Sequence, residues 1–369
     1  MLQARTPLVS VIVPAYNAER LIDRTLTSVL NQTYRHLEVW VVDDGSYDQT
    51  PAIVRHFAGR DPRVHLLQQA NSGVAAARNL GIQHAQGEFI APIDADDLWY
   101  PEALSKLVAC LQGCRPTVGV VYAWSIDIDE QDEPTGGFHT ATIRGNVYKT
   151  LICHNFLGNG SATLIRKACL KQVEGYNTQL KVQKAQGCED WDLYVRLAEY
   201  YEFGVVPEFL IGYRKVASSM SGDFDQMARS QQLMLQTIQQ KHPELSAYLY
   251  RLSRSSFYLY LAQQCNTSGD ARATLAWLWQ AVKADPITSL GRLGLYLLLI
   301  NNLVKLVRES WLWLSPEVVF MPQRSTLQDL LMKESLPTLV CPPSLPIHPL
   351  KIWLKVLVGK VLHQSLSRI

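Results

Sequence analysis

Short β-branched runs alternate with longer helix-like stretches through residues 1–125 of the chain. The runs occupy residues 8–14, 37–44, 64–69 and 88–93, and they do not strictly alternate apolar with polar side chains. A near-continuous apolar strand is typical of a sheet covered on both faces. Strands separated by helices favour parallel pairing, because each helix carries the chain back across the sheet. The pattern predicts an α/β fold, with a mainly parallel sheet and helices on both faces.

Acidic and aromatic residues follow three of these strands, at the edge where a parallel sheet binds its ligands. They are Pro14, Ala15 and Tyr16 after the first run, Asp43 and Asp44 at the end of the second, and Asp94, Asp96 and Asp97 after the fourth. Singly, each aspartate also fits a turn or a helix cap, and the tyrosine also fits ordinary packing. Together at one edge they indicate a binding site. Carboxylates this close repel one another, so the acidic stretch also requires a positive partner.

The composition excludes some classes of function. The 369 residues include 35 Lys and Arg against 33 Asp and Glu, and this net charge of +2 is spread along most of the chain, which predicts no nucleic-acid partner. Seven cysteines lack metal-ligand spacing and indicate reduced, buried thiols. The N-terminal residues show no long apolar segment before a cleavage site, which predicts a cytoplasmic protein without a signal peptide.

Three segments carry a resemblance to a known family. Residues 9–50 (VSVIVPAYN to VVDDGSYDQT), 71–97 (NSGVAAARN to APIDADD) and 187–198 (GCEDWDLYVRLA) resemble family 2 glycosyltransferases, in the family's order and spacing from Val9 to Arg214. The resemblance implies the GT-A fold, with its Rossmann-like sheet, and inverting transfer from a nucleotide-sugar donor. The QxxRW sequence of processive polysaccharide synthases is missing, which favours transfer of one sugar per encounter.

The resemblance implies that the acidic stretch binds the donor through a divalent cation. Asp96 is then the direct ligand of Mn²⁺ or Mg²⁺, Asp94 holds the ribose or its hydroxyl, and Arg78 approaches the diphosphate. Such a cation typically takes one or two protein carboxylates, and it neutralises the charge of the leaving group. The cation is the positive partner that the cluster requires. Asp97 also fits a cap on the next helix, and Arg78 also fits a salt bridge on a helix surface.

The same resemblance implies a nucleotide pocket. Tyr16, beside Pro14 and Ala15, forms the wall on which the base stacks. Asp43 accepts the imide N–H of uracil or thymine, which implies a UDP- or dTDP-sugar. Asp44 is its neighbour in the motif, with a structural role.

The segment GCEDWDL supplies the acceptor side. Glu189, Asp190 and Asp192 stand at the start of a predicted amphipathic helix, where acidic residues also serve as caps. By resemblance, Asp190 is the general base that takes the proton of the acceptor hydroxyl as its oxygen attacks C1. Glu189 orients this neighbourhood. Trp191 either contacts the sugar or is a buried aromatic.

The composition changes near residue 222. Residues 1–221 are the expected catalytic domain, with a donor half at 1–125 and an acceptor half at 126–221, and residues 222–369 are expected to be helical. Residues 243–286 include one tetratricopeptide-like helix pair, and a single such unit favours packing over a repeat array. The uncharged run 293–304 is too short to span a bilayer.

The tail after Glu334 contains no acidic residue. On a helix, Lys351, Lys355 and His363 would share one face, which predicts peripheral contact at the cytoplasmic face of a membrane, with lysines toward anionic lipid. Docking on the protein's own core or on a partner is the other interpretation.

Two further classes of function fit parts of the sequence. DADDL approaches the nucleophile motif of haloacid-dehalogenase-type phosphatases, with Asp94 and Asp96 as its aspartates, but Leu98 stands at the Thr or Val position. That motif also normally follows the first strand. A non-catalytic helical adaptor is the third class, opposed by the intact Asp43, Asp96 and Asp190. The sequence does not identify the sugar, the oligomeric state, or the acceptor beyond a glycan, lipid-linked or cell-surface hydroxyl.

Overall fold

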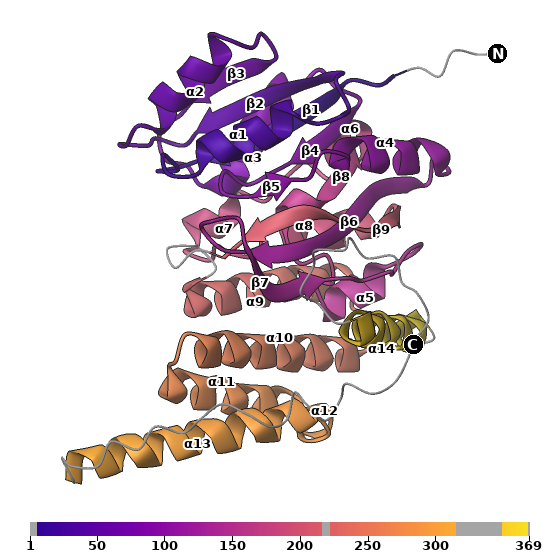
Figure 1. Cartoon of the computed structure of the whole chain (residues 1–369). Helices are drawn as coiled ribbons and strands as arrows, with labels where there is room; N and C mark the ends of the chain where they lie inside the picture. The colour runs from indigo at the N-terminus through magenta and orange to yellow at the C-terminus, as the bar shows by residue number, and fades with distance from the viewer. Residues whose placement is uncertain (1–5, 216–221, 315–348, 368–369) are drawn as a thin grey trace. The chain divides into compact units, whose positions relative to one another are not determined.

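The computed structural model separates into two units (Figure 1). It describes residues 6–215, 222–314 and 349–367. The first unit runs through Pro243 and takes in most of the last helix, and the second unit begins at Glu244. The division therefore differs from the sequence-based boundary at residue 222. Helix α9 (Phe224–Lys241) and the C-terminal helix both belong with the first unit.

Four parallel strands form one side of the sheet, in the order β3-β2-β1-β4. They are β1 (Val9–Ala15), β2 (Leu37–Asp43), β3 (Val64–Gln68) and β4 (Phe89–Pro92), and they alternate with α1 (Ile22–Leu30), α2 (Thr50–Ala58) and α3 (Val74–His84). Every residue of the central strand β1 is buried, because helices cover both faces of the sheet there. The α/β fold predicted from the uninterrupted apolar runs is confirmed.

Beyond β4 the sheet is mixed. Strand β8 (Thr163–Arg166) is antiparallel to both β4 and β6 (Val118–Ile128), whereas β9 (Glu202–Arg214) is parallel to β6. Strand β7 (Pro134–His139) pairs antiparallel with β6, and β5 (Leu98–Trp99) pairs antiparallel with β9. Helices α4 (Ala103–Gly113), α5 (Tyr148–Cys153), α6 (Lys167–Gln172), α7 (Gln179–Val182) and α8 (Glu189–Ala198) accompany these strands.

The pairing register brings the strand ends together. Asp43, the last residue of β2, pairs with Ala15 of β1 and with Gln68 of β3. The chain segments that follow these strands therefore emerge at one edge of the sheet. Helix α3 lies close to the sheet, because a Cβ at its Gly81 would come within 2.8 Å of Ile12 Cγ2.

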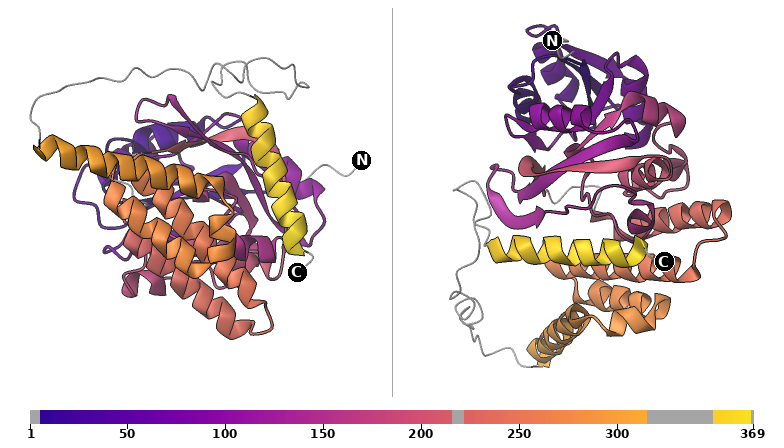
Figure 2. Two further views of the ribbon diagram at one scale, coloured as in Figure 1. Left: turned by 90° about the horizontal axis from the view of Figure 1, so that it is seen from below. Right: turned by 90° about the vertical axis from the view of Figure 1, so that its right-hand side faces the viewer.

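The second unit is a layer of antiparallel helices (Figure 2). It contains α10 (Ala247–Thr267), α11 (Ala271–Ala284), α12 (Pro286–Leu290) and α13 (Leu293–Leu314). Asp270 and Asp285 cap α11 and α12 by accepting backbone N–H groups. Ala262, Leu278 and Leu295 form its buried centre. The predicted pair in residues 243–286 is α10 with α11.

Helix α14 (Pro349–Ser367) turns two of its basic groups onto the first unit. Lys355 Nζ donates to Phe138 O at 2.6 Å and lies 4.1 Å over the Phe138 ring, and His363 Nδ1 lies 2.7 Å from Thr150 Oγ1. The prediction that the lysines of this face turn toward lipid is wrong for Lys355, which is held by Phe138, and His363 on the same face also contacts protein. Docking on the protein, the other interpretation, holds for this face. None of the helices in the described ranges combines the length and the apolar character needed to cross a bilayer.

Candidate active site

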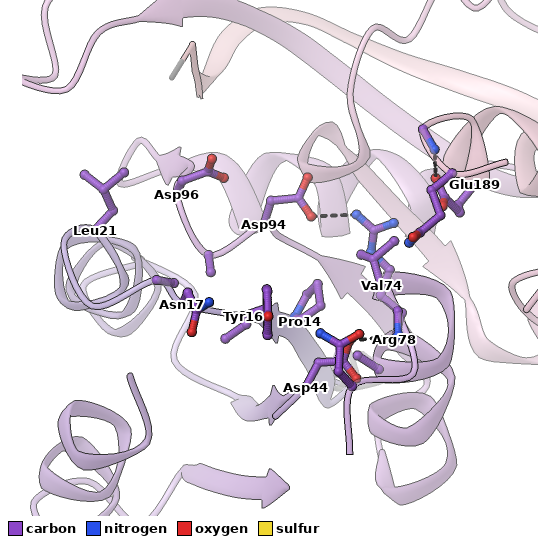
Figure 3. Close-up of a pocket in the computed structure, with 18 of the residues that line it drawn as sticks. Pro14, Tyr16, Asn17, Leu21, Asp44, Val74, Arg78, Asp94, Asp96 and Glu189 are labelled. Carbon is purple, nitrogen blue, oxygen red and sulfur yellow. Dashed lines mark hydrogen bonds and ion pairs between the residues drawn. The ribbon is translucent and has the colours of Figure 1, made fainter. Parts of the chain in front are cut away.

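A cavity of about 560 Å³ lies where the strand-end loops meet the start of α8 (Figure 3). Its lining includes most of the site residues predicted from the sequence, namely Pro14, Ala15, Tyr16, Arg78, Asp94, Asp96, Glu189 and Asp190. Asp43 and Trp191 are not among the lining residues. The structure thus brings the donor-side and acceptor-side motifs to one cavity, although residue 16 and residue 190 are far apart in the chain.

Tyr16 presents an open aromatic face at this cavity. Its side chain is 49% exposed, and its ring meets Tyr47 edge-on with 6.2 Å between centroids. The next residue, Asn17, has a φ of +50°, a left-handed conformation that Asn tolerates better than most residues. Its Oδ1 accepts from Tyr47 N at 3.1 Å, and its own N donates to Ser46 Oγ at 2.9 Å. These bonds fix the turn that places Tyr16.

Asp43 lies behind the cavity lining and is 1% exposed. Its Oδ1 accepts from Ser46 N at 3.1 Å, and its Oδ2 accepts from Gln68 Nε2 at 3.0 Å. Both oxygens are therefore engaged within the protein. The uracil or thymine of a nucleotide could bond to the Asp43 carboxylate only if the Gln68 side chain moved away.

Asp44, by contrast, borders the cavity. Its carboxylate accepts from Gln69 Nε2 at 2.7 Å, from Ser72 N at 2.7 Å and from Gly73 N at 2.8 Å. These bonds hold the loop that leads into α3. These contacts agree with the structural role that was expected for Asp44.

The acidic stretch after β4 is anchored by its last member. Asp97 is fully buried, and it accepts from Ser161 Oγ at 2.5 Å and from Arg214 N at 2.8 Å. It anchors the loop to two distant segments instead of capping α4. Burial raises the pKa of Asp96 to about 6, and the neighbouring charge of Asp94 adds to the increase.

Arg78 bridges the two sides of the cavity. Its side chain is only 3% exposed, and it donates from Nη2 to Asp94 Oδ1 at 2.5 Å and from Nη1 to Asp190 Oδ1 at 2.7 Å. The Tyr176 ring lies 5.0 Å from its Cζ. Figure 3 shows Asp94 directed at Arg78, with Asp96 on the other side of Asp94. Arg78 is thus a buried cation between two carboxylates, and the contact is not a helix-surface salt bridge.

In the first turn of α8, the carboxyl groups of Glu189 and Asp190 make different contacts. Glu189 Oε2 accepts from Gly187 N, just before the helix, at 2.8 Å, whereas Asp190 turns to Arg78. Burial raises the pKa of Asp190 to about 7, although the charge of Arg78 opposes this. A carboxyl group that titrates near neutrality suits a general base. Gly160 makes room for it, because a Cβ there would lie 2.8 Å from Asp190 Oδ2.

The other two residues of this turn belong to the packing of α8. Trp191 is 4% exposed, and its Nε1 donates to Leu151 O at 2.6 Å. Asp192 is also buried and accepts from Arg196 Nε at 2.8 Å. Of the two interpretations of Trp191, its contacts fit the buried aromatic.

The cavity also contains residues that the sequence analysis missed. Lys181 lines it, donates from Nζ to Asn71 O at 2.9 Å, and lies over Gly73, where a Cβ would come within 2.6 Å of Lys181 Cδ. Tyr213 and Gln186 line it too. Gly73, which belongs to the segment 71–97, has a φ of +90°, a conformation that glycine adopts readily. The other three stand in segments without a motif.

One acidic residue retains free ligand capacity. Within the part of the chain that the structure describes, no cluster of three or more His, Cys, Asp or Glu side chains is arranged to hold a metal ion. Asp96 lines the cavity, and no other residue in those ranges donates a hydrogen bond to its carboxylate. It can therefore give one oxygen ligand to a cation whose other ligands come from a bound diphosphate or from water.

The sheet, with strand-end loops that meet the acidic start of α8 at one cavity, has the arrangement of the GT-A fold. Comparison with known proteins agrees. Residues 10–172 match the model of the family described as glycosyl transferase family 2. The matched segment, somewhat under half of the chain, is similar to glycosyltransferase family 2.

The similar proteins are longer enzymes or share the fold. Chondroitin synthase of Escherichia coli is 31% identical over 203 residues, which cover 54% of this chain and 28% of that protein. Hyaluronan synthase of Pasteurella multocida is 29% identical over 203 residues, which cover 54% of this chain and 19% of that protein. The chain thus matches less than a third of the length of either relative. The crystal structure of S. aureus TarS 1–349 superimposes with a TM-score of 0.54 at 20% identity, over 76% of this chain and 82% of that one.

Proposed function

We propose that the chain moves a sugar from a UDP- or dTDP-sugar to a hydroxyl of a glycan, lipid-linked or cell-surface acceptor. The reaction is one displacement: the acceptor oxygen bonds to C1 as the C1–O bond to the diphosphate breaks, so the configuration at C1 inverts. The observation that carries the proposal is the Asp190 carboxylate, which lies in the same cavity as Asp94 and Asp96 and is joined to the former through Arg78.

The donor is proposed to lie along the strand-end loops. The exposed ring of Tyr16 offers a stacking surface for the base, with Pro14 and Ala15 beside it. Asp94 holds the ribose or its hydroxyl, and its contact with Arg78 fixes its orientation. S. aureus TarS 1–349 was also solved with UDP. Asp43 remains the proposed reader of the imide N–H, on condition that its bond from Gln68 opens.

The residues at the cavity fit a divalent cation. Asp96 has a carboxylate directed at the cavity and a pKa raised by burial, so a cation would relieve an unfavourable charge there. We propose that Asp96 holds Mn²⁺ or Mg²⁺, which when bound supplies positive charge to the leaving diphosphate. The positive charge of Arg78 is already neutralised by Asp94 and Asp190. The charge of the leaving diphosphate must therefore be neutralised largely by other groups.

Asp190 is the proposed general base. One oxygen accepts from Arg78, which keeps the carboxyl group oriented and favours its ionised form. The proton of the acceptor hydroxyl passes to Asp190 as the oxygen attacks C1. Glu189, buried beside it and lining the same cavity, is proposed to orient this neighbourhood. Trp191 is buried against α5, so we propose support of α8 as its contribution.

The proposed acceptor class follows from the relatives and from the sequence. Both relatives above are named as synthases of polysaccharides, which supports a role in polysaccharide biosynthesis of the cell envelope. The missing QxxRW sequence favours addition of single sugars. Peripheral contact with an anionic membrane at the cytoplasmic face belongs to the same proposal, because lipid-linked acceptors are held there.

Neither alternative function is favoured by an observation. A phosphatase of the haloacid dehalogenase type needs a free aspartate nucleophile, whereas Asp94 follows the fourth strand and is held by Arg78. A non-catalytic adaptor has no use for a cavity that collects six carboxylates and a buried arginine.

A donor screen tests the proposal. The native protein is incubated with Mn²⁺ and a panel of UDP-, dTDP-, GDP- and ADP-sugars, and thermal stabilisation and release of nucleoside diphosphate are measured. We expect a UDP- or dTDP-sugar to stabilise the protein and to release its diphosphate. Release of phosphate from monoesters without any response to nucleotide sugars would instead support a phosphatase.

A further inference from the structure

Helix α13 is apolar on two opposite sides. One side, with Leu295, Leu298 and Leu299, packs into the buried centre of the second unit. The other side carries seven large apolar side chains that are each 41–73% exposed. They are Leu293, Tyr296, Leu297, Ile300, Leu303, Val304 and Val307, and we call them the α13 stripe.

The α13 stripe is continuous. Its members recur at intervals of three and four residues, so at 100° per residue they fall within a sector of about 120°. From Leu293 to Val307 the stripe extends about 21 Å along the helix axis at 1.5 Å per residue. No charged residue interrupts it. A contiguous exposed apolar surface of this kind marks an interaction site more often than isolated exposed residues do.

The surroundings of the stripe are positively charged. Residues 244–314 contain seven basic and four acidic residues, a net charge of +3. Two of the acidic residues, Asp270 and Asp285, are occupied as helix caps. The charged residues of 286–314 are Arg292, Lys305, Arg308 and Glu309, and Arg308 is exposed at the edge of the stripe. The complementary partner is therefore apolar at its centre and negatively charged around it.

We propose that the α13 stripe is the surface by which this protein rests on a membrane of anionic lipid. An amphipathic helix lying in the plane of the interface buries its apolar side among acyl chains and places basic residues among headgroups. A second copy would present the same net positive charge around its own stripe and would be repelled, so anionic lipid fits better. The inference names a surface for the membrane contact proposed above, and its failure leaves sugar transfer unaffected.

The test compares two matched sets of exposed apolar residues. The triple variant Leu297→Gln, Ile300→Gln, Val304→Gln removes the centre of the stripe, and the triple variant Leu354→Gln, Val358→Gln, Val361→Gln removes exposed apolar residues of α14. Glutamine is uncharged, like the residues that it replaces, and it is compatible with a helix. Full-length proteins are mixed with vesicles of phosphatidylcholine alone or with phosphatidylglycerol added, and sedimentation, mass in solution and thermal unfolding are measured.

We expect the native protein to bind the vesicles that contain phosphatidylglycerol, less so at higher salt. The α13 variant should bind at least tenfold more weakly while unfolding at a similar temperature, and the α14 variant should bind within about twofold of native, since only the stripe is buried in lipid. Loss of binding in the α14 variant alone overturns the inference. Failure of the native protein to bind either kind of vesicle also overturns the inference. This holds if the native protein is a dimer that the α13 variant converts to a monomer, and it holds equally if both proteins are monomers.

Discussion

The proposed donor half and the proposed acceptor half of the first unit contribute to the cavity in different ways. In the donor half, residues that line the cavity follow directly from strand ends, as Tyr16 follows β1 and Asp94 follows β4. In the acceptor half, the lining depends on pairs that are distant in sequence. Arg78 is 112 residues from Asp190, and Lys181 is 110 residues from Asn71.

The sheet fixes the positions of the cavity loops, whereas contacts between the two halves set their charge. The sheet fixes where the donor loops emerge, because parallel strands end at a common edge. Arg78 then links a donor-side carboxylate to the proposed base, so the charge state of one half depends on the other. Changes that break this link should therefore affect both halves, whereas changes on one side should affect one binding event.

The largest expected effect follows from Asp190→Asn. The substitution keeps the shape of the side chain and removes its basicity, so we expect turnover to fall by about 10²–10⁴-fold while donor affinity changes little. Initial rates and donor titrations measure both quantities. Asp192→Asn is the matched control, because Asp192 lies in the same helical turn but pairs with Arg196 outside the cavity lining. Near-native turnover of Asp190→Asn, with collapsed donor binding, would pass the role of base to Glu189.

Arg78→Gln should damage both halves at once. It leaves two carboxylates without their buried cation, so we expect a loss of about 3–5 kcal/mol in the free energy of unfolding, together with weaker donor binding and slower turnover. Arg78→Lys keeps the charge but not the two-pronged geometry, and its losses should be smaller. Urea unfolding and kinetics are measured on the same preparations. If Arg78→Gln unfolds like the native protein, the bridge does not join the two halves.

Asp96→Ala should affect the donor side alone. We expect donor and Mn²⁺ binding to weaken together by about 10–100-fold, the size of one lost contact to a charged group. Higher Mn²⁺ concentration should restore part of the turnover, because the diphosphate supplies other ligands. Calorimetric titration of UDP with and without Mn²⁺ measures the coupling. Loss of UDP binding that is equal with and without the metal would remove Asp96 from the metal site.

The smallest effect concerns base preference. Asp43→Ala should reduce the preference for UDP or dTDP over ADP by about two- to tenfold, as expected for one hydrogen bond. Asp44→Ala should instead weaken all three nucleotides alike, because it releases the loop that contains Gly73. Competition titrations compare the two variants. If only Asp44→Ala changes the preference for UDP or dTDP over ADP, then Asp44, and not Asp43, recognises the nucleotide base.

The sequence predicted what depends on local pattern. Apolar runs and strand-end motifs placed Tyr16, Asp94 and Asp96 correctly at one cavity, because register follows from parallel pairing. It did not predict that Arg78 is shared between two carboxylates, since this contact requires α8 to pack beside α3. The tail shows the same limit. Helical periodicity grouped Lys355 with His363, but the identity of the neighbouring surface decided that they face protein.

The pH dependence of turnover tests the role of Asp190 most directly. Burial raises the pKa of Asp190 to about 7, so the proposed base is mostly protonated below that pH and mostly ionised above it. With saturating donor and Mn²⁺, we expect native turnover to rise about tenfold per pH unit below pH 7 and to level off above it. Asp190→Asn should lose this limb and give a low, flat profile. A variant that keeps the same rising limb as the native protein would contradict the assignment of Asp190 as the general base.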